Sequence, residues 1–194
     1  MKQIVLISAI LLAAGFSHAQ KIIITEGDGV GLLKIGQSMD ELVNILGFKG
    51  TLKSYEDYVA EELFTEDPAK SLECIIGFDY YIKYQHLITV PVSYIFIKNN
   101  VVSQIKLTSF PEYFFGISRA TTTSNGLPFW ANKDEMIKLY GNPDATREYE
   151  SFILETSVYF DKGIAFSFRD SNYRVAHIFK KPSADLIKKF NSQG

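Results

Sequence analysis

The sequence has little cysteine and little histidine. Cys74 is the single cysteine among 194 residues, so the chain can form neither an internal disulfide nor a zinc site built from cysteines. Its neighbours Ile75 and Ile76 predict a buried, inert thiol, whereas a reactive thiol would need an electropositive pocket. No His-x-x-x-His or Glu-x-x-His spacing marks a metal site, and no Gly-x-Ser-x-Gly elbow marks a nucleophile. We therefore expect no metal, no cofactor and no catalytic residue.

Long apolar runs are absent after the first twenty residues. That first segment has Lys2, an apolar run from Ile4 to Phe16, and small residues up to Ala19, which is the layout of a secretory signal peptide. The run is shorter than the roughly 20 residues that span a bilayer. We expect cleavage after Ala19 or Gln20 and export to a bacterial periplasm or the medium, which suits a chain without disulfides. An uncleaved N-terminal anchor is the alternative.

A strong charge of either sign is also absent. The chain has 20 basic and 22 acidic residues, a net charge of −2, and removal of the leader with Lys2 leaves −3. Nucleic-acid-binding domains normally carry a basic stripe, so we expect no nucleic acid as a partner. An acidic run predicts a solvated face, with weak calcium binding as the alternative. It comprises Glu61, Glu62, Glu66 and Asp67.

One short helical pattern occurs twice, in residues 38–47 and 132–141, 94 positions apart. Ser38 with Glu41 predicts a capping box, and an asparagine with a glutamate repeats it in the second copy. Both copies end in glycine, the residue that most often terminates a helix in the left-handed region. Their apolar side chains recur at helical spacing and predict docking on an apolar surface: Leu42, Ile45, Leu46, Met136, Leu139 and Tyr140.

Strands follow each helix. Alternating apolar residues predict strands at 152–160, 164–168 and 175–179 in the second copy. In the first copy they predict strands at 74–84, 92–96 and 101–107. Segment 55–73 reads equally as a short helix or an irregular loop. The fold class is therefore α+β, with two tandem repeats, each a short capped helix packed on an antiparallel sheet.

The expected organisation has five parts. Residues 1–20 form the signal peptide, 21–111 the first α+β repeat, and 112–127 an aromatic, threonine-rich connector. Residues 128–182 form the second repeat. Ser183 begins a short C-terminal helix and tail over 183–194.

Two short sequence segments resemble segments of known families. They are Ile35-Gly36-Gln37-Ser38 with Leu46-Gly47, and Leu139-Tyr140-Gly141-Asn142-Pro143. With the repeated unit, the chain resembles the tandem α+β architecture of the β-lactamase-inhibitor protein family over roughly residues 30–182. It also resembles the small outer-membrane assembly lipoproteins of the same fold group. The resemblance implies a protein-binding module, often one that uses the open face of its sheet.

Aromatic and polar side chains supply the candidate binding residues. Three consecutive rings in the connector, with a tryptophan shortly after it, either join the two copies or form an exposed anchor patch. Strand alternation separates Tyr81 from Tyr80 and Tyr84. Alignment of the last hairpins places Gln104 and His177 on one face, predicted to be open, with two isoleucines, at 105 and 178, on the other. The candidates are Tyr81, Gln104, Tyr113, Phe114, Phe115, Trp130 and His177.

The sequence thus predicts an exported, non-enzymatic protein-binding module, inhibitor-like or envelope-assembly-like, whose partner is another protein. The alternative is a small secreted hydrolase that uses His177 or His86 with nearby acids, although no motif marks such a site.

Overall fold

The computed structural model contains both helices and antiparallel-rich sheets, which confirms the α+β class. None of the helices it describes has the length and apolar character needed to cross a lipid bilayer. The predicted signal peptide, the connector aromatics Tyr113, Phe114 and Phe115, and both His86 and Trp130 lie outside the described residues. The described residues are 22–46, 51–63, 67–84, 92–108, 121–129, 131–149, 154–169 and 172–192.

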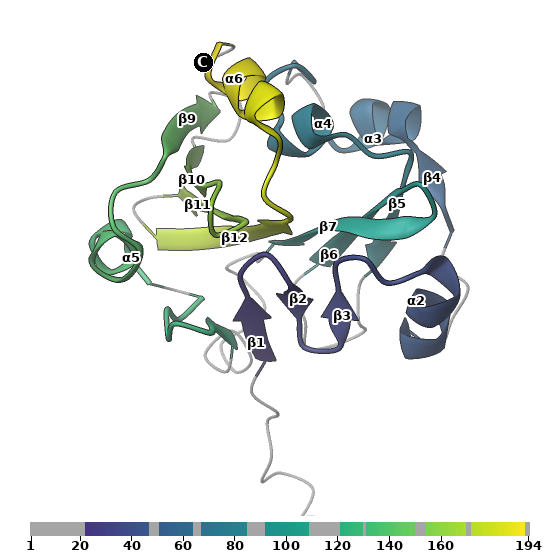
Figure 1. The fold of residues 1–194 in the computed structure, drawn as a ribbon, viewed down its shortest axis with the longest axis horizontal. Coiled ribbons are helices and arrows are strands. Elements are labelled where there is room, and N and C mark those ends of the chain that lie inside the picture. Colours follow the sequence, from purple (N-terminus) through teal and green to yellow (C-terminus); the bar gives the residue numbers. More distant parts are fainter. Residues whose placement is uncertain are drawn as a thin grey trace, which may run out of the picture.

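The centre of the molecule is an eight-stranded antiparallel sheet (Figure 1). The strand order in the second half is the reverse of that in the first, and the halves join where β7 pairs with β12 and Ile105 lies opposite Ile178. Helix α2 (Met39–Leu46) precedes the first half and α5 (Lys133–Tyr140) the second. In order, the strands are β4 (Lys53–Ser54), β5 (Tyr80–Tyr84), β6 (Val92–Lys98), β7 (Val101–Thr108), β12 (Asn172–Phe179), β11 (Ile164–Arg169), β10 (Leu154–Tyr159) and β9 (Ala145–Tyr149).

A smaller sheet, with α2 and α5, covers the face of the large sheet that we name the lower face (Figure 1). The small sheet has the order β3 (Leu33–Lys34), β2 (Gly29–Val30), β1 (Ile22–Thr25) and β8 (Thr121–Thr123), with β1 and β8 parallel. A row of apolar side chains crosses six strands of the large sheet on this face and forms the middle of the main core. In strand order, the row is Ile82, Ile95, Ile105, Ile178, Ile164 and Tyr159.

Three further helices cover the opposite, upper face (Figure 1). They are α3 (Tyr55–Glu61), α4 (Leu72–Ile76) and α6 (Ala184–Ser192). The sheet presents large apolar side chains on this face too, including Phe96 and Phe179, and Tyr58 and Phe190 from the helices pack against them. Burial of that second apolar surface is the reason for the cover. The open face expected for Gln104 and His177 is therefore wrong, because both side chains are buried. Segment 55–73, which was compatible with a helix or a loop, contains α3 at 55–61 and the start of α4 at Leu72.

The predicted helix starts are confirmed, whereas Gly47, the predicted end of the first helix, lies outside the described residues. The Ser38 backbone N–H donates to Glu41 Oε2 at 2.8 Å, and the Glu41 N–H donates to Ser38 Oγ at 3.3 Å. Asn132 and Glu135 form the same capping box at the start of α5. Gly141 ends α5 with a φ of 81°, a region that favours glycine. At the other end of the chain, α6 follows Ser183, whose Oγ accepts the Leu186 N–H as predicted.

The predicted strand over 74–84 is wrong in its first half. Ser71 caps α4 by accepting the Cys74 N–H, and Gly77, with a φ of 85°, ends the helix before β5 starts at Tyr80. A short apolar run does not by itself distinguish a strand from a buried helix, and the serine cap and the glycine decide for helix here. The turn predicted at Asn99 and the following Asn100 is confirmed, since both residues have positive φ.

Candidate functional site

The three candidate binding residues that the structure describes lie on the upper face. Gln104 and His177 share that face, as predicted, and their side chains are in contact, with His177 Nε2 2.8 Å from Gln104 Oε1. Neither is open to solvent: His177 is 4% exposed, and Gln104 and Tyr81 are fully buried beneath the upper helices. The other candidates, Tyr113 to Phe115 and Trp130, lie outside the described residues.

Around His177 lies a set of interacting polar side chains that we name the buried polar cluster. Glu73 of α4 is its centre, because its Oε1 accepts from Lys106 Nζ at 2.6 Å and from the Tyr58 hydroxyl. The other Glu73 oxygen, Oε2, lies 3.9 Å from His177 Nδ1. The cluster comprises Tyr58 from α3, Glu73 from α4, Gln104 and Lys106 from β7, and His177 from β12.

Gln104 fixes the tautomer of His177. Its amide nitrogen donates to the Glu73 backbone carbonyl at 3.2 Å and to the Gly77 carbonyl at 3.3 Å. Carbonyl oxygens only accept, so the amide oxygen of Gln104 must face the histidine. His177 Nε2 therefore carries the proton in the neutral ring, and Nδ1 carries the lone pair that faces Glu73 Oε2.

The charges in the cluster follow from burial and neighbours. Burial raises the pKa of Glu73, but the Lys106 ammonium, His177 and two hydrogen bonds outweigh it and lower that pKa to about 2. Burial lowers the pKa of His177 to about 4, against the attraction of Glu73 and with the help of Lys106. Burial raises the Tyr58 pKa well above its usual value, and the Glu73 carboxylate, which would repel an ionised phenol, raises it further. At neutral pH the cluster therefore holds one anion, one cation and a neutral imidazole.

Aromatic rings enclose the cluster. The Phe96 and Phe179 rings lie 6.1 Å and 5.6 Å from the His177 ring, centroid to centroid. The Tyr58 ring packs edge-on against Phe78, Tyr81 and Phe96. These contacts keep water away from the ionised groups, which strengthens their mutual interaction.

Sequence reasoning did not find Glu73, Lys106 or Tyr58. The available signal was a single glutamate inside the apolar run Leu72–Ile76, because a carboxylate placed there requires a buried cation or donor. Its partners lie 15 and 33 positions away in sequence, and only the fold identifies them.

The two side chains here that could act in catalysis, His177 and Cys74, are constrained by their surroundings. Both ring nitrogens of His177 face groups of the protein, Gln104 on one side and Glu73 on the other, so no nitrogen is presented to a substrate. Burial raises the pKa of the neighbouring Cys74 thiol to about 11, which makes it a poor nucleophile. In the ranges that the structure covers, no group of three or more His, Cys, Asp or Glu side chains is placed to hold a metal ion.

The acidic run at the end of α3 is exposed at Glu61 and Asp67, as predicted, but not at Glu62, and Glu66 lies outside the described residues. Glu62 accepts from Lys83 Nζ at 2.8 Å and from the Tyr94 hydroxyl at 2.7 Å, and its side chain is mostly buried. Glu61 pairs with Lys53 of β4. These pairs offset the unfavourable position of two carboxylates at a helix C-terminus.

Exposed apolar side chains are the other surface feature. Two of the six large ones in the described chain lie at the edge of the large sheet where β4 pairs with β5. Tyr80 pairs with Ser54, which is two positions after Leu52, so strand alternation places the Leu52 and Tyr80 side chains on the same face. We name this pair the apolar corner; it consists of Leu52 and Tyr80.

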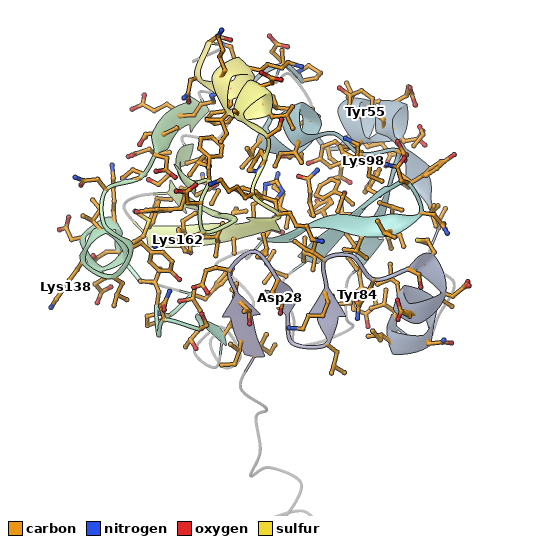
Figure 2. The ribbon with its side chains drawn as sticks, in the orientation of Figure 1. Asp28, Tyr55, Tyr84, Lys98, Lys138 and Lys162 are labelled. Carbon is orange, nitrogen blue, oxygen red and sulfur yellow. The ribbon has the colours of Figure 1, made fainter. Side chains whose placement is uncertain are left out.

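In Figure 2, Tyr55 lies on α3 and Lys98 reaches towards α4, where its Nζ donates to the Ile76 carbonyl at 3.1 Å.

Comparison with protein-family models, curated proteins and solved structures gave no match. The resemblance to β-lactamase-inhibitor proteins and assembly lipoproteins stays a prediction.

Proposed function

We propose that this chain is an exported, non-enzymatic protein-binding module and that the apolar corner is its contact surface. The observation that carries the proposal is the exposure of large apolar side chains there, with Tyr80 at 48% and Leu52 at 41%. Tyrosine is enriched at the energetic centres of protein interfaces, because it combines a large apolar ring with a polar hydroxyl. The partner on this proposal is another protein with a complementary apolar side chain.

The interior supports the non-enzymatic part of the proposal. The described histidine, His177, and the central acid, Glu73, are both buried and engaged by neighbouring elements. A general base must reach the proton that it abstracts, and neither group faces solvent. Their arrangement suits a rigid scaffold that displays a surface.

Duplication and export complete the proposal. Each half of the large sheet is a four-strand meander preceded by a helix with a capping box, as expected if one ancestral unit was copied. The first twenty residues read as a signal peptide, which on this proposal directs the chain to a bacterial periplasm or the medium. The aromatic residues Tyr113, Phe114, Phe115 and Trp130 are a second predicted contact region.

The test compares two surface variants. The protein and its Leu52→Ser/Tyr80→Ser variant are cross-linked in periplasmic extract, and captured proteins are identified by mass spectrometry. Leu139→Ser is the matched control, because Leu139 on α5 is as exposed as Tyr80, at 48%, but lies at the opposite end of the molecule (Figure 1). We expect one specific partner to be captured by the protein and the control and lost from the double variant.

Equal capture by all three proteins would remove the apolar corner from the proposal. Each variant must first show an unchanged thermal midpoint, so that a lost partner reports the surface and not the fold. Hydrolysis of ester or peptide substrates that disappears in His86→Ala or His177→Ala would instead support the hydrolase alternative.

A further inference from the structure

We propose that the buried polar cluster is an acid-sensitive latch, which holds α3 and α4 on the large sheet and releases them when His177 takes up a second proton. This inference concerns the interior of the molecule and does not depend on the partner or on the apolar corner. It rests on the hydrogen-bond geometry of the cluster and on the elements from which its members come.

The latch joins the two helices to the sheet. Glu73 of α4 binds Lys106 of β7 through its carboxylate, and its backbone carbonyl accepts from Gln104 of the same strand. Tyr58 of α3 donates to the same carboxylate. The contacts of Glu73 and Gln104 therefore secure both ends of α4, and the Tyr58 hydroxyl adds α3 to the same anion.

At neutral pH the latch is balanced in charge but lacks one donor. His177 Nε2–H donates to Gln104, so the Nδ1 lone pair faces the Glu73 carboxylate at 3.9 Å. No hydrogen bond joins Nδ1 to any residue within the described ranges. A proton on Nδ1 would supply the missing donor. It would also give the buried site two cations, His177 and Lys106, for a single carboxylate.

The groups that face the imidazole decide the direction of the effect. Glu73 from α4 attracts the extra proton, and Lys106 from β7 repels it. Gln104 from β7 accepts but carries no charge, Tyr58 from α3 is neutral, and the Phe96 and Phe179 rings from β6 and β12 exclude water. Burial is the largest of these influences and disfavours the charged ring. The charged ring is therefore more stable when water reaches it than when the site is enclosed.

Detachment of α4 is the smallest movement that exposes the ring. Helix α4 has only five residues, and together with its C-cap Gly77 it supplies both the carboxylate and the two carbonyls that hold Gln104 in place. When α4 moves away, water reaches His177, whose pKa returns towards its ordinary value. Proton uptake by the open form then shifts the equilibrium towards opening as the pH falls.

Hydrogen exchange followed by mass spectrometry tests the latch in the purified protein at pH 7 and pH 5. Rates are corrected for the intrinsic pH dependence of exchange, and α5 on the lower face is the internal reference. We expect amides of 55–61 and 72–77 to lose protection by about tenfold relative to α5 at pH 5, the size expected when a proton binds mainly to the open form. His177→Gln retains a hydrogen-bonding side chain but cannot become charged, so its protection ratio should not change.

Three results would overturn the proposal. One is an unchanged ratio of protection between the upper helices and α5 in the protein itself. A second is an equal loss in α5, which would report global unfolding. The third is the same pH-specific loss in His177→Gln. If that variant does not fold, the comparison of helices within the unmodified protein still decides.

Discussion

The guanidinium of Arg147 lies over the ring of Phe190, with Cζ 3.7 Å from the ring centroid. The same side chain donates to the Lys70 carbonyl at 2.6 Å and to the carbonyl of Phe190. One residue of the edge strand β9 thereby connects the segment before α4 with the last turn of α6. A cation at a helix C-terminus also interacts favourably with the helix dipole.

Replacement of Arg147 should therefore loosen α6. We expect Arg147→Ala to lower the free energy of unfolding by about 2 kcal/mol or more, because a buried charged donor to two carbonyls is lost. Lysine should restore little of it, since it lacks the planar fork. Urea denaturation measures the effect, with Arg169→Ala as the control, because Arg169 is exposed on β11. Equal midpoints for the two alanine variants would contradict this assignment.

Stability should fall in mild acid because of His177. Its pKa is lowered from 6.5 to about 4, so the unfolded chain binds more protons than the folded one between these values. The stabilisation is complete above pH 6.5 and is lost as the pH falls towards 4, by roughly 2–3 kcal/mol. Urea denaturation at pH 7, 5.5 and 4 measures the slope.

The variant His177→Gln separates this contribution from that of Glu73. The Glu73 pKa is lowered from 4.5 to about 2, so its contribution is complete above pH 4.5 and is lost only below that value. We expect the variant to be less stable at pH 7 but nearly independent of pH between 7 and 5. An unchanged slope would show that another group titrates.

Cys74 should be slow to react in the folded protein. Burial raises its pKa to about 11, so at pH 8 about one thiol in a thousand is ionised, whereas an ordinary thiol of pKa near 8.5 is about one quarter ionised. We expect alkylation by iodoacetamide at pH 8 to be at least about 100-fold slower than in urea. Similar rates in both conditions would place the thiol at the surface.

Two glycines with positive φ should differ in their tolerance of a side chain. At Gly141 a Cβ would meet no atom within 4 Å, so Gly141→Ala should cost about 1 kcal/mol, from backbone strain alone. Gly141→Val should cost that much or more, because its branched side chain adds strain. At Gly163 a Cβ would lie 2.2 Å from the Phe179 carbonyl oxygen, so Gly163→Ala should lower the thermal midpoint much further. Equal midpoints for the two alanine variants would contradict the close approach at Gly163.

Local features of the fold were predictable because their causes are local. Ser38 and Asn132 predict the starts of their helices, because each forms a cap with a residue three positions away. Asn99-Asn100 predicts a turn, because asparagine tolerates positive φ. Strand alternation also placed Gln104 and His177 together, because a period of two assigns faces without reference to the rest of the chain.

The cover of the upper face was not predictable in the same way. Whether a sheet face is open depends on which distant segment packs on it, and α3, α4 and α6 come from two separate parts of the chain. Glu73 illustrates the difficulty, because its apolar neighbours suit a strand or a helix equally. Its role becomes visible only with Lys106, 33 positions later.

The parallel pairing of Ile22 with Thr121 has a consequence for the order of assembly. Four strands of the large sheet, β4 to β7, are made between these residues, and Glu26 binds Asn125 across 99 positions of sequence. Closing so long a loop costs more conformational entropy than closing the two-residue turn between β6 and β7. Of the strand pairs in the described residues, this one therefore closes the longest segment of chain, and we expect the short hairpins to form before it.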